Sequence, residues 1–138
     1  MDATIQTTAL THHGAKRMLQ AAVEAAEKSG QPQCIVIVEA SGQLIAEIRM
    51  TGAKFLSRKS AKSKALTAAS LGVPSADAPD AVRPAIGAAT GGAVTVLPGG
   101  LPIIVDGVLV GGIGVGSGTG AQDIDVAQAA LAAIGAPL

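Results

Sequence analysis

The sequence contains one phenylalanine, no tyrosine and no tryptophan among its 138 residues. Proteins that bind single-stranded nucleic acids usually stack bases on aromatic side chains, so this composition argues against that function. The formal net charge is zero, which leaves no overall field to attract DNA or an anionic membrane. We therefore expect neither a nucleic acid nor a membrane among the partners of the protein.

Cysteine and long apolar segments are also scarce. The only cysteine, Cys34, excludes an intrachain disulfide and a cysteine-cluster metal site, and its place in the segment CIVIV is typical of a buried, inert thiol. The N-terminal stretch MDATIQTTALTHHGAKR lacks the apolar centre of a secretory signal. No apolar stretch of about 18 residues is free of Gly, Pro and charge, as a membrane span requires. We expect a cytoplasmic protein.

Charged residues make up 14% of the chain, whereas hydrophobic residues make up 49%. With so few charges, part of the apolar surface is expected to lie in a subunit interface, so the composition predicts a homo-oligomer. The length is typical of a single domain, here taken as residues 1–138.

The N-terminal half predicts a helix, a hairpin and a second helix. Apolar residues at helical spacing predict the first helix over 11–29, with Thr11 as N-cap. The apolar run 33–39 and the alternating run 44–50 predict a hairpin. Ser57 is the expected N-cap of a helix over 58–71, which ends at a glycine.

The C-terminal half predicts a short helix near 79–89, three strands and a last helix over 121–134. The strands are expected over 93–97, 101–105 and 108–115, and an Asp-Gly turn at 106–107 favours a hairpin between the last two. Because hairpins dominate, we predict an α+β domain with a mainly antiparallel sheet and helices packed against it.

The segment GGIGVGSGTGAQD, residues 111–123, has six glycines in its first ten positions. It does not match the dinucleotide fingerprint, because Ser117 or Thr119 occupies the third glycine position and only one helix follows. Gly111 and Gly112 within a strand predict close approach of another chain or a flat ligand. The turn at 116–120 is expected to offer free backbone N–H groups.

Five of the ten basic residues lie between positions 54 and 64: Lys54, Arg58, Lys59, Lys62 and Lys64. Arg58 and Lys62 are like-charge neighbours on the predicted helix, so they form either a solvated face or a patch for carboxylate or phosphate groups. Lys64 points to another side, toward Thr67, and is a candidate pocket residue. Asp123 falls in the first turn of the last helix, where it either complements the helix dipole or faces a ligand.

His12 and His13 are the only histidines, and both lie in the first turn of the first predicted helix. His12 is expected on the apolar stripe and His13 on the polar side. The positive end of the helix favours the neutral, ligating imidazole, so either residue is a candidate iron ligand. The alternative is that each simply packs or caps the helix.

Three stretches together resemble one known family: LTHHGAKRMLQAAVEAA, RMTGAKFLSRKSAKSKALTAA and PGGLPIIVDGVLVGGIGVGSGTGAQDIDVAQAA. They are similar to the GlcG/HbpS-like family, also called the haem-degrading domain family, which includes the C-terminal domain of PduO-type proteins. The resemblance implies a profilin-like fold with a five-stranded antiparallel sheet, oligomers from dimers to octamers, and haem binding in some members. It marks Lys64, Thr67, Gly99, Gly100 and Gln122–Asp123 as pocket candidates.

Three hypotheses about function follow. In the first, the protein binds haem: His12, His13 or the Thr67 hydroxyl ligates the iron, and Arg58 or Lys62 meets the propionates.

In the second, it is an enzyme, or an accessory to one, that acts on an anionic metabolite without haem. Lys64 is then a general base or electrostatic stabiliser with Asp123 as its partner, and Gly99 and Gly100 supply N–H donors. In the third, it is a non-catalytic assembly module.

Overall fold

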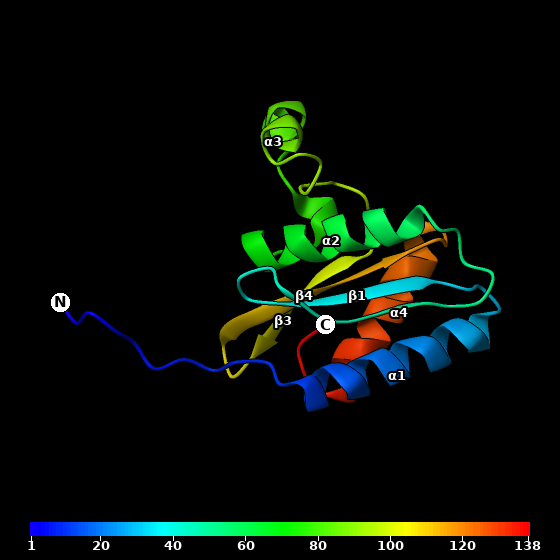
Figure 1. The fold of residues 1–138 in the computed structure, drawn as a ribbon, viewed down its shortest axis with the longest axis horizontal. Helices are drawn as coiled ribbons and strands as arrows, with labels where there is room; N and C mark the ends of the chain where they lie inside the picture. Colours follow the sequence, from blue (N-terminus) through cyan, green and yellow to red (C-terminus); the bar gives the residue numbers. More distant parts are fainter.

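The computed structural model describes the backbone of residues 1–138 and every side chain except that of Val82. Its strands are β1 (Cys34–Glu39), β2 (Leu44–Arg49), β3 (Gly100–Val105) and β4 (Val108–Gly116). Its α-helices are α1 (His12–Ser29), α2 (Ser57–Leu71), α3 (Arg83–Ala89) and α4 (Gly120–Ala133), and 3₁₀ turns lie at Ser75–Asp77 and Asp80–Val82. The strands form one antiparallel sheet in the order β2-β1-β4-β3, with α2 on one face and α1 and α4 on the other (Figure 1).

The α+β class is confirmed, but the expected fifth strand is absent from the described backbone. Residues 93–97 belong to no strand, and hydroxyl oxygens accept three of their N–H groups. The N–H of Val94 donates to Thr90 Oγ1, and the N–H of Thr95 donates to Thr67 Oγ1. The segment therefore lies tied to hydroxyl groups instead of joining the sheet.

The predicted hairpin between β3 and β4 is confirmed. Asp106 and Gly107 have φ values of 51° and 75°, and Val105 pairs with Val108 across them. Two successive positive φ values are those of a tight turn whose twist matches the strands, and Asp and Gly tolerate them best.

The helix starts confirm one expected cap and correct another. Thr11 caps α1, because its side chain accepts the N–H of Gly14 at 3.2 Å. The expected cap Ser57 is instead the first residue of α2, and no side chain caps that helix. The reason is the preceding turn, whose Lys54 carbonyl already accepts the Ser57 N–H.

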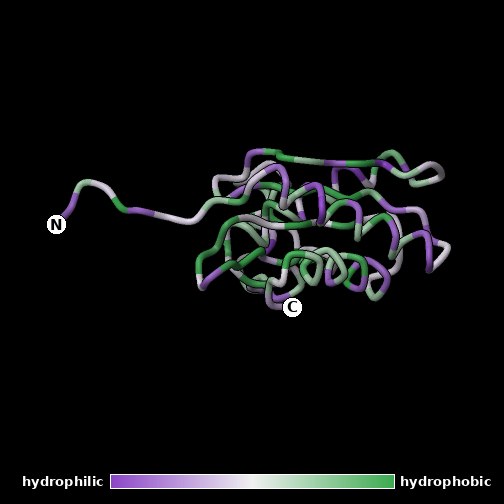
Figure 2. Tube along the Cα trace, turned by 90° about the horizontal axis from the view of Figure 1, so that it is seen from below, coloured by the Kyte–Doolittle hydropathy of each residue, from purple (hydrophilic) through white to green (hydrophobic). Residues whose placement is uncertain are grey.

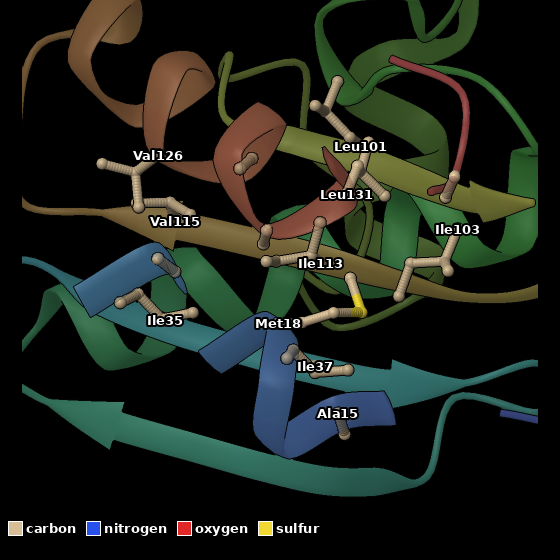
Figure 3. Packing of buried hydrophobic residues seen from close by; sticks show 14 of the residues in the cluster. Ala15, Met18, Ile35, Ile37, Leu101, Ile103, Ile113, Val115, Val126 and Leu131 are labelled. Carbon is tan, nitrogen blue, oxygen red and sulfur yellow. The ribbon is translucent and has the colours of Figure 1, made fainter. Parts of the chain in front are cut away.

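Large side chains fill the space between the sheet and the α1/α4 layer. Figure 3 shows side chains from both helices and the strands converging there. Fully buried members are Met18 of α1, Ile35 and Ile37 of β1, Ile103 of β3, Ile113 of β4 and Leu131 of α4. The apolar stripe predicted for the first helix faces this core, which confirms its periodicity.

Small residues line the opposite face, where α2 lies on the sheet. The buried alanines Ala61, Ala65 and Ala69 recur every four residues along α2 and form one stripe. A Cβ on Gly114 would stand 1.9 Å from the Ala61 carbonyl oxygen, so helix and strand backbones nearly touch.

Burial here raises the pKa of the Cys34 thiol, although Arg49 and Arg58 partly offset it, in keeping with an inert thiol.

Two segments lie away from this layered body. Residues 1–9 are exposed and extend outward, as Figures 1 and 2 show. The described side chains of α3 include no buried one, and Figure 1 shows this helix standing off beyond α2.

Candidate functional site

A buried ion pair joins α2 to α4 at one end of the sheet. Lys64 Nζ lies 2.9 Å from Asp123 Oδ2 and 2.7 Å from the carbonyl oxygen of Val115. The side chains of Lys64 and Asp123 are only 6% and 4% exposed. The two residues proposed as catalytic partners on sequence grounds are thus in direct contact, although 59 positions separate them.

The turn before α4 holds Asp123 in place. Thr119 and Gln122 form a reciprocal capping box that fixes the start of the helix. Asp123 follows in the first turn, where the helix dipole favours a carboxylate. Its Oδ1 accepts the N–H of Gly118 at 3.0 Å while its Oδ2 accepts Lys64. Because both carboxylate oxygens are engaged, Asp123 orients Lys64 more readily than it abstracts a proton itself.

Lys64 retains a donor. An ammonium group has three N–H bonds, and within the described part of the chain only two of them have acceptors. As a donor to a carboxylate and a carbonyl, Lys64 has the geometry of an electrostatic stabiliser and not of a general base.

A pocket of about 270 Å³ opens beside the ion pair, and we call it the polar pocket. Its lining residues are Lys54, Ser57, Ser60, Lys64, Leu97, Pro98, Ser117, Gly118, Gly120 and Asp123. A buried cation, hydroxyl groups and a small apolar wall therefore meet in one concave site. Such a combination is typical of sites for small polar ligands.

Ser117 on the rim of the polar pocket has a strained backbone. Its φ is 93°, a value that non-glycine residues rarely adopt and that costs about 1–3 kcal/mol. Two contacts hold it there: its Oγ accepts the N–H of Lys54, and its carbonyl oxygen accepts Gln31 Nε2, each at 3.0 Å. Strain of this kind concentrates at ligand sites.

Gln33 is a residue that sequence reasoning missed. Its side chain is fully buried, and neither amide atom has a hydrogen-bond partner among the described residues. A Cβ on Gly118 would lie 2.5 Å from Gln33 Nε2 and 2.9 Å from Asp123 Oδ1, so the amide sits directly behind the pocket wall. The sequence signal that could have identified Gln33 is its place as a polar residue immediately before the apolar run of β1.

The glycines of residues 111–123 allow close packing within the chain and do not form an open cradle. Gly111 and Gly112 do allow close approach, but the neighbours are this chain's own Val38 and Ala65 backbones, not another chain or a flat ligand. The expectation of free N–H groups in the turn is corrected at two positions. Gly118 donates to Asp123, and Thr119 donates to Gln122 Oε1.

Gly99 and Gly100 adjoin the ion pair, but their backbones are engaged. A Cβ on Gly99 would stand 2.8 Å from Asp123 Cβ, and one on Gly100 would stand 2.3 Å from the Lys64 carbonyl oxygen. The N–H of Gly100 donates to Ser75 Oγ, and the N–H of Val115 donates to the Gly99 carbonyl. These glycines make room for the ion pair, and Gly100 has no free N–H for a ligand.

Thr67 is fully buried beside the 93–95 segment. Its hydroxyl oxygen accepts the N–H of Thr95 at 3.0 Å and lies 2.7 Å from the Ser63 carbonyl oxygen, to which it donates. Because this hydroxyl both donates and accepts a hydrogen bond within the chain, it is suited to holding the 93–95 loop in place.

His12 and His13 begin α1 on the other side of the sheet. Their ring centroids lie 4.0 Å apart, and both residues are exposed, so the expected place of His12 on the buried stripe is wrong. The buried face of α1 begins at Gly14 and Ala15, one turn short of the expected stripe. A shallow pocket of about 160 Å³ lies against their sequence neighbours Thr11 and Gly14, and we call it the histidine groove. Its lining residues are Thr8, Ala9, Leu10, Thr11, Gly14, Arg17, Val105, Val110 and Ile134.

Arg58 and Lys62 lie far from the histidines, because α2 and α1 cover opposite faces of the sheet (Figure 1). Both basic residues are exposed, and Arg58 pairs with Glu47 of β2 at 3.2 Å. That carboxylate relieves the like-charge pair without a ligand. One copy of the chain therefore does not bring the proposed histidine iron ligands and the proposed propionate partners together.

No helix in the described part of the chain has the length and apolarity to cross a membrane. Likewise, no three described His, Cys, Asp or Glu side chains gather as a metal site would require. Cytoplasmic localisation stays a prediction.

Comparisons of the sequence with known proteins agree on one family. The profile of the haem-degrading HbpS-like proteins matches residues 10–132. The corrinoid adenosyltransferase PduO of Salmonella typhimurium is 36% identical over 133 residues, covering 91% of this chain and 39% of PduO. An uncharacterised 15.0 kDa protein from the dhaT-dhaS intergenic region of Citrobacter freundii is 32% identical and covers 95% of this chain and 96% of its own length. The chain thus spans about two fifths of the PduO protein that it matches.

Solved structures resemble the whole layered body. A crystal structure of a PduOC:heme complex superposes with a TM-score of 0.87 at 33% identity, covering 94% of this chain and 98% of the other. A double mutant of HbpS from Streptomyces reticuli has a TM-score of 0.83 at 34% identity, covering 94% of this chain and 89% of the other.

Proposed function

The chain belongs to the haem-degrading HbpS-like family, and from this premise we propose that it is a haem-binding protein. The observation that carries the proposal is the close match, over 94% of this chain, to a domain whose structure was solved as a complex with haem. We propose the histidine pair at the start of α1 as the source of the iron ligand.

The residues around the histidine groove fit a porphyrin in their chemistry. Within the described part of the chain, the imidazole rings of His12 and His13 make no hydrogen bond, so their ring nitrogens remain available as ligands. The groove beside them is walled by Leu10, Val105 and Ile134, which suit the apolar porphyrin face. Haem bound there would supply iron for ligand-binding or redox chemistry.

His13 is better oriented than His12. Arg17 lies four residues after His13 on the same face of α1 and lines the groove. A guanidinium in that place suits a propionate. His12 falls on the other side of the helix from Gly14, which also lines the groove. We therefore rank His13 first as the iron ligand and Arg17 first as the propionate partner.

The size of the groove supports a site shared between copies. At about 160 Å³ it is smaller than the roughly 300 Å³ from which small-molecule pockets usually begin. One copy thus buries only part of a porphyrin, and a second copy completes the site. In this homo-oligomer, Arg58 and Lys62 meet a haem only if they come from the neighbouring copy.

Titration of the purified chain with haemin, read at the Soret band, tests the proposal. We expect saturation at a fixed stoichiometry, and loss of the histidine-type spectrum in His13→Ala and in the double variant His12→Ala/His13→Ala. Gln20→Ala, an exposed change on the same helix, is the matched control and should bind as the unchanged protein does. A non-saturating curve, or an unchanged spectrum in the double variant, would refute the proposed ligand.

A further inference from the structure

The polar pocket has no role in the proposed haem site, yet its floor is a buried cation with a free donor. We propose that it binds a small carboxylate of a few carbons, whose oxygen accepts the third N–H of Lys64. The contacts of the ion pair, the charge of the lining, the hydroxyl groups and the size of the pocket support this assignment independently of haem.

The ion pair compensates the charge of Lys64, which lines the pocket, but leaves one of its N–H groups without an acceptor within the described part of the chain. Asp123 Oδ2 and the Val115 carbonyl take two of its three protons, and Gly118 occupies the other oxygen of Asp123. A buried ammonium is costly unless its hydrogen bonds are satisfied. A ligand oxygen in the pocket satisfies the remaining one.

The charge of the lining favours a monoanion. Two lysines, Lys54 and Lys64, and one aspartate, Asp123, give a net charge of +1. A single carboxylate brings the site to neutrality. A phosphate dianion would exceed that charge and would face the Asp123 carboxylate.

Two hydroxyl groups add donors at the rim. Ser117 Oγ accepts the N–H of Lys54, so its own proton is free to donate. Ser57 Oγ lines the same pocket and makes no hydrogen bond within the described part of the chain. Together with Lys64 they offer three donors, one charged and two neutral, and a carboxylate has lone pairs enough to accept all three. The strained backbone of Ser117 serves to keep its hydroxyl at this rim.

The size and wall of the pocket limit the ligand. About 270 Å³ lies just below the usual range for drug-sized ligands, which begins near 300 Å³. Leu97 and Pro98 add apolar surface to the lining. A short alkyl chain on the carboxylate therefore has a surface to contact.

The polar pocket and the histidine groove are separate sites. Asp123 lies near the start of α4, and Ile134 of the groove lies just after its end. Eleven residues of helix place them about 16 Å apart. Failure of haem binding and failure of carboxylate binding are therefore distinguishable.

Amide NMR of the full chain, titrated with sodium propionate against sodium chloride at equal ionic strength, tests the proposal. We expect saturable shifts centred on the amides of Lys54 and Gly118. Propionamide, which has the same shape without the charge, should bind at least about tenfold more weakly, because charged hydrogen bonds are the stronger ones. Shifts that do not saturate, or that lie elsewhere on the molecule, would overturn the proposal.

Variants assign the binding to Lys64. Lys64→Met should weaken propionate at least about tenfold, and Ser57→Ala, a change at a partly exposed hydroxyl that leaves the core intact, about threefold or more. Lys59→Met removes the same charge from the exposed side of α2 and should change nothing. If Ser57→Ala bound propionate as tightly as the unchanged protein does, the site would be refuted. The same affinity in a folded Lys64→Met would also refute it. Tighter binding of inorganic phosphate than of propionate would refute the carboxylate class.

Discussion

The two faces of the sheet are buried by different means. On the α1/α4 side, isoleucine, leucine and methionine side chains fill the gap between the layers. On the α2 side, alanines of the helix lie on glycines of β4, so that backbones nearly touch. Alternate residues of one strand serve the two faces, with Ile113 toward the large side chains and Gly114 toward α2. Adjacent positions of one strand are therefore sensitive to opposite kinds of change, Ile113 to a loss of side-chain volume and Gly114 to a gain.

The difference in packing also explains where the ion pair lies. Close approach of α2 brings Lys64 over the end of β4, where it reaches the Val115 carbonyl and Asp123 of α4. The pair thus links the helix of one face to a helix of the other. A wider gap filled by large side chains would have kept the lysine from this position.

Gly114→Ala should give the largest loss of stability. The new Cβ would stand 1.9 Å from the Ala61 carbonyl oxygen and 2.6 Å from the Ala65 nitrogen, so the whole helix must move. We expect a loss of about 4 kcal/mol or more, above the usual range for overpacking, because the clashing atoms are backbone. Urea denaturation measures it.

The matched control is Gly87→Ala in α3, where the nearest atom to a new Cβ is 3.8 Å away. It should leave stability unchanged or raise it by up to about 1 kcal/mol, since alanine is the better helix former. Similar small effects of both substitutions would show that α2 does not depend on close contact.

Lys64→Met should cost about 3–5 kcal/mol, because it leaves the Asp123 carboxylate buried without its cation. The double variant Lys64→Met/Asp123→Asn should recover a large part of this loss. An asparagine oxygen still accepts the N–H of Gly118, and no charge is left in the interior. Urea midpoints of the two variants decide the point: a double variant no more stable than the single one would contradict the account of the pair.

Ile113→Ala should cost about 3 kcal/mol and Ile113→Val about 1 kcal/mol, since the cost on this face follows the methyl groups removed. Thermal unfolding of both variants gives the ratio. If the two variants lost equal stability, the α1/α4 face would be held by something other than side-chain volume, and the contrast between the faces would fail.

Thr119→Ala should have a small effect, about 1 kcal/mol, through loss of the capping box of α4. Thr11→Ala removes the corresponding cap from α1 and should cost a similar amount. Only Thr119→Ala should also loosen the polar pocket, seen as faster hydrogen exchange at Gly118. Equal exchange in both variants would show that the cap does not support the pocket.

Local patterns in the sequence were enough for most elements. The apolar stripe of α1, the Thr11 cap and the Asp106–Gly107 turn each depend on residues within a few positions of one another. The expected strand at 93–97 failed because its N–H groups are taken by Thr90 and by the distant Thr67. Alternation along a segment does not reveal whether a neighbouring strand is present to pair with it.

Local sequence patterns likewise predicted only part of the candidate site. Lys64 stood out on its predicted helix and Asp123 at a helix start, but nothing local placed them in contact. Gln33 looked like an ordinary polar residue before a strand until its amide proved buried without partners. From the sequence alone, the histidines and Arg58 were compatible with one ligand. In the structure they lie on opposite sides of the sheet.

By itself, the sequence determined the α+β class, the family and the starts and ends of most helices and hairpins, because these follow from short-range periodicity, caps and turn residues. Only the tertiary structure decided that the glycines of β4 receive α2, that Lys64 retains a free donor in a pocket, and that the sheet has four strands. Those features depend on which distant groups lie within a few ångströms, and a backbone approach of that kind leaves no periodic trace along the chain.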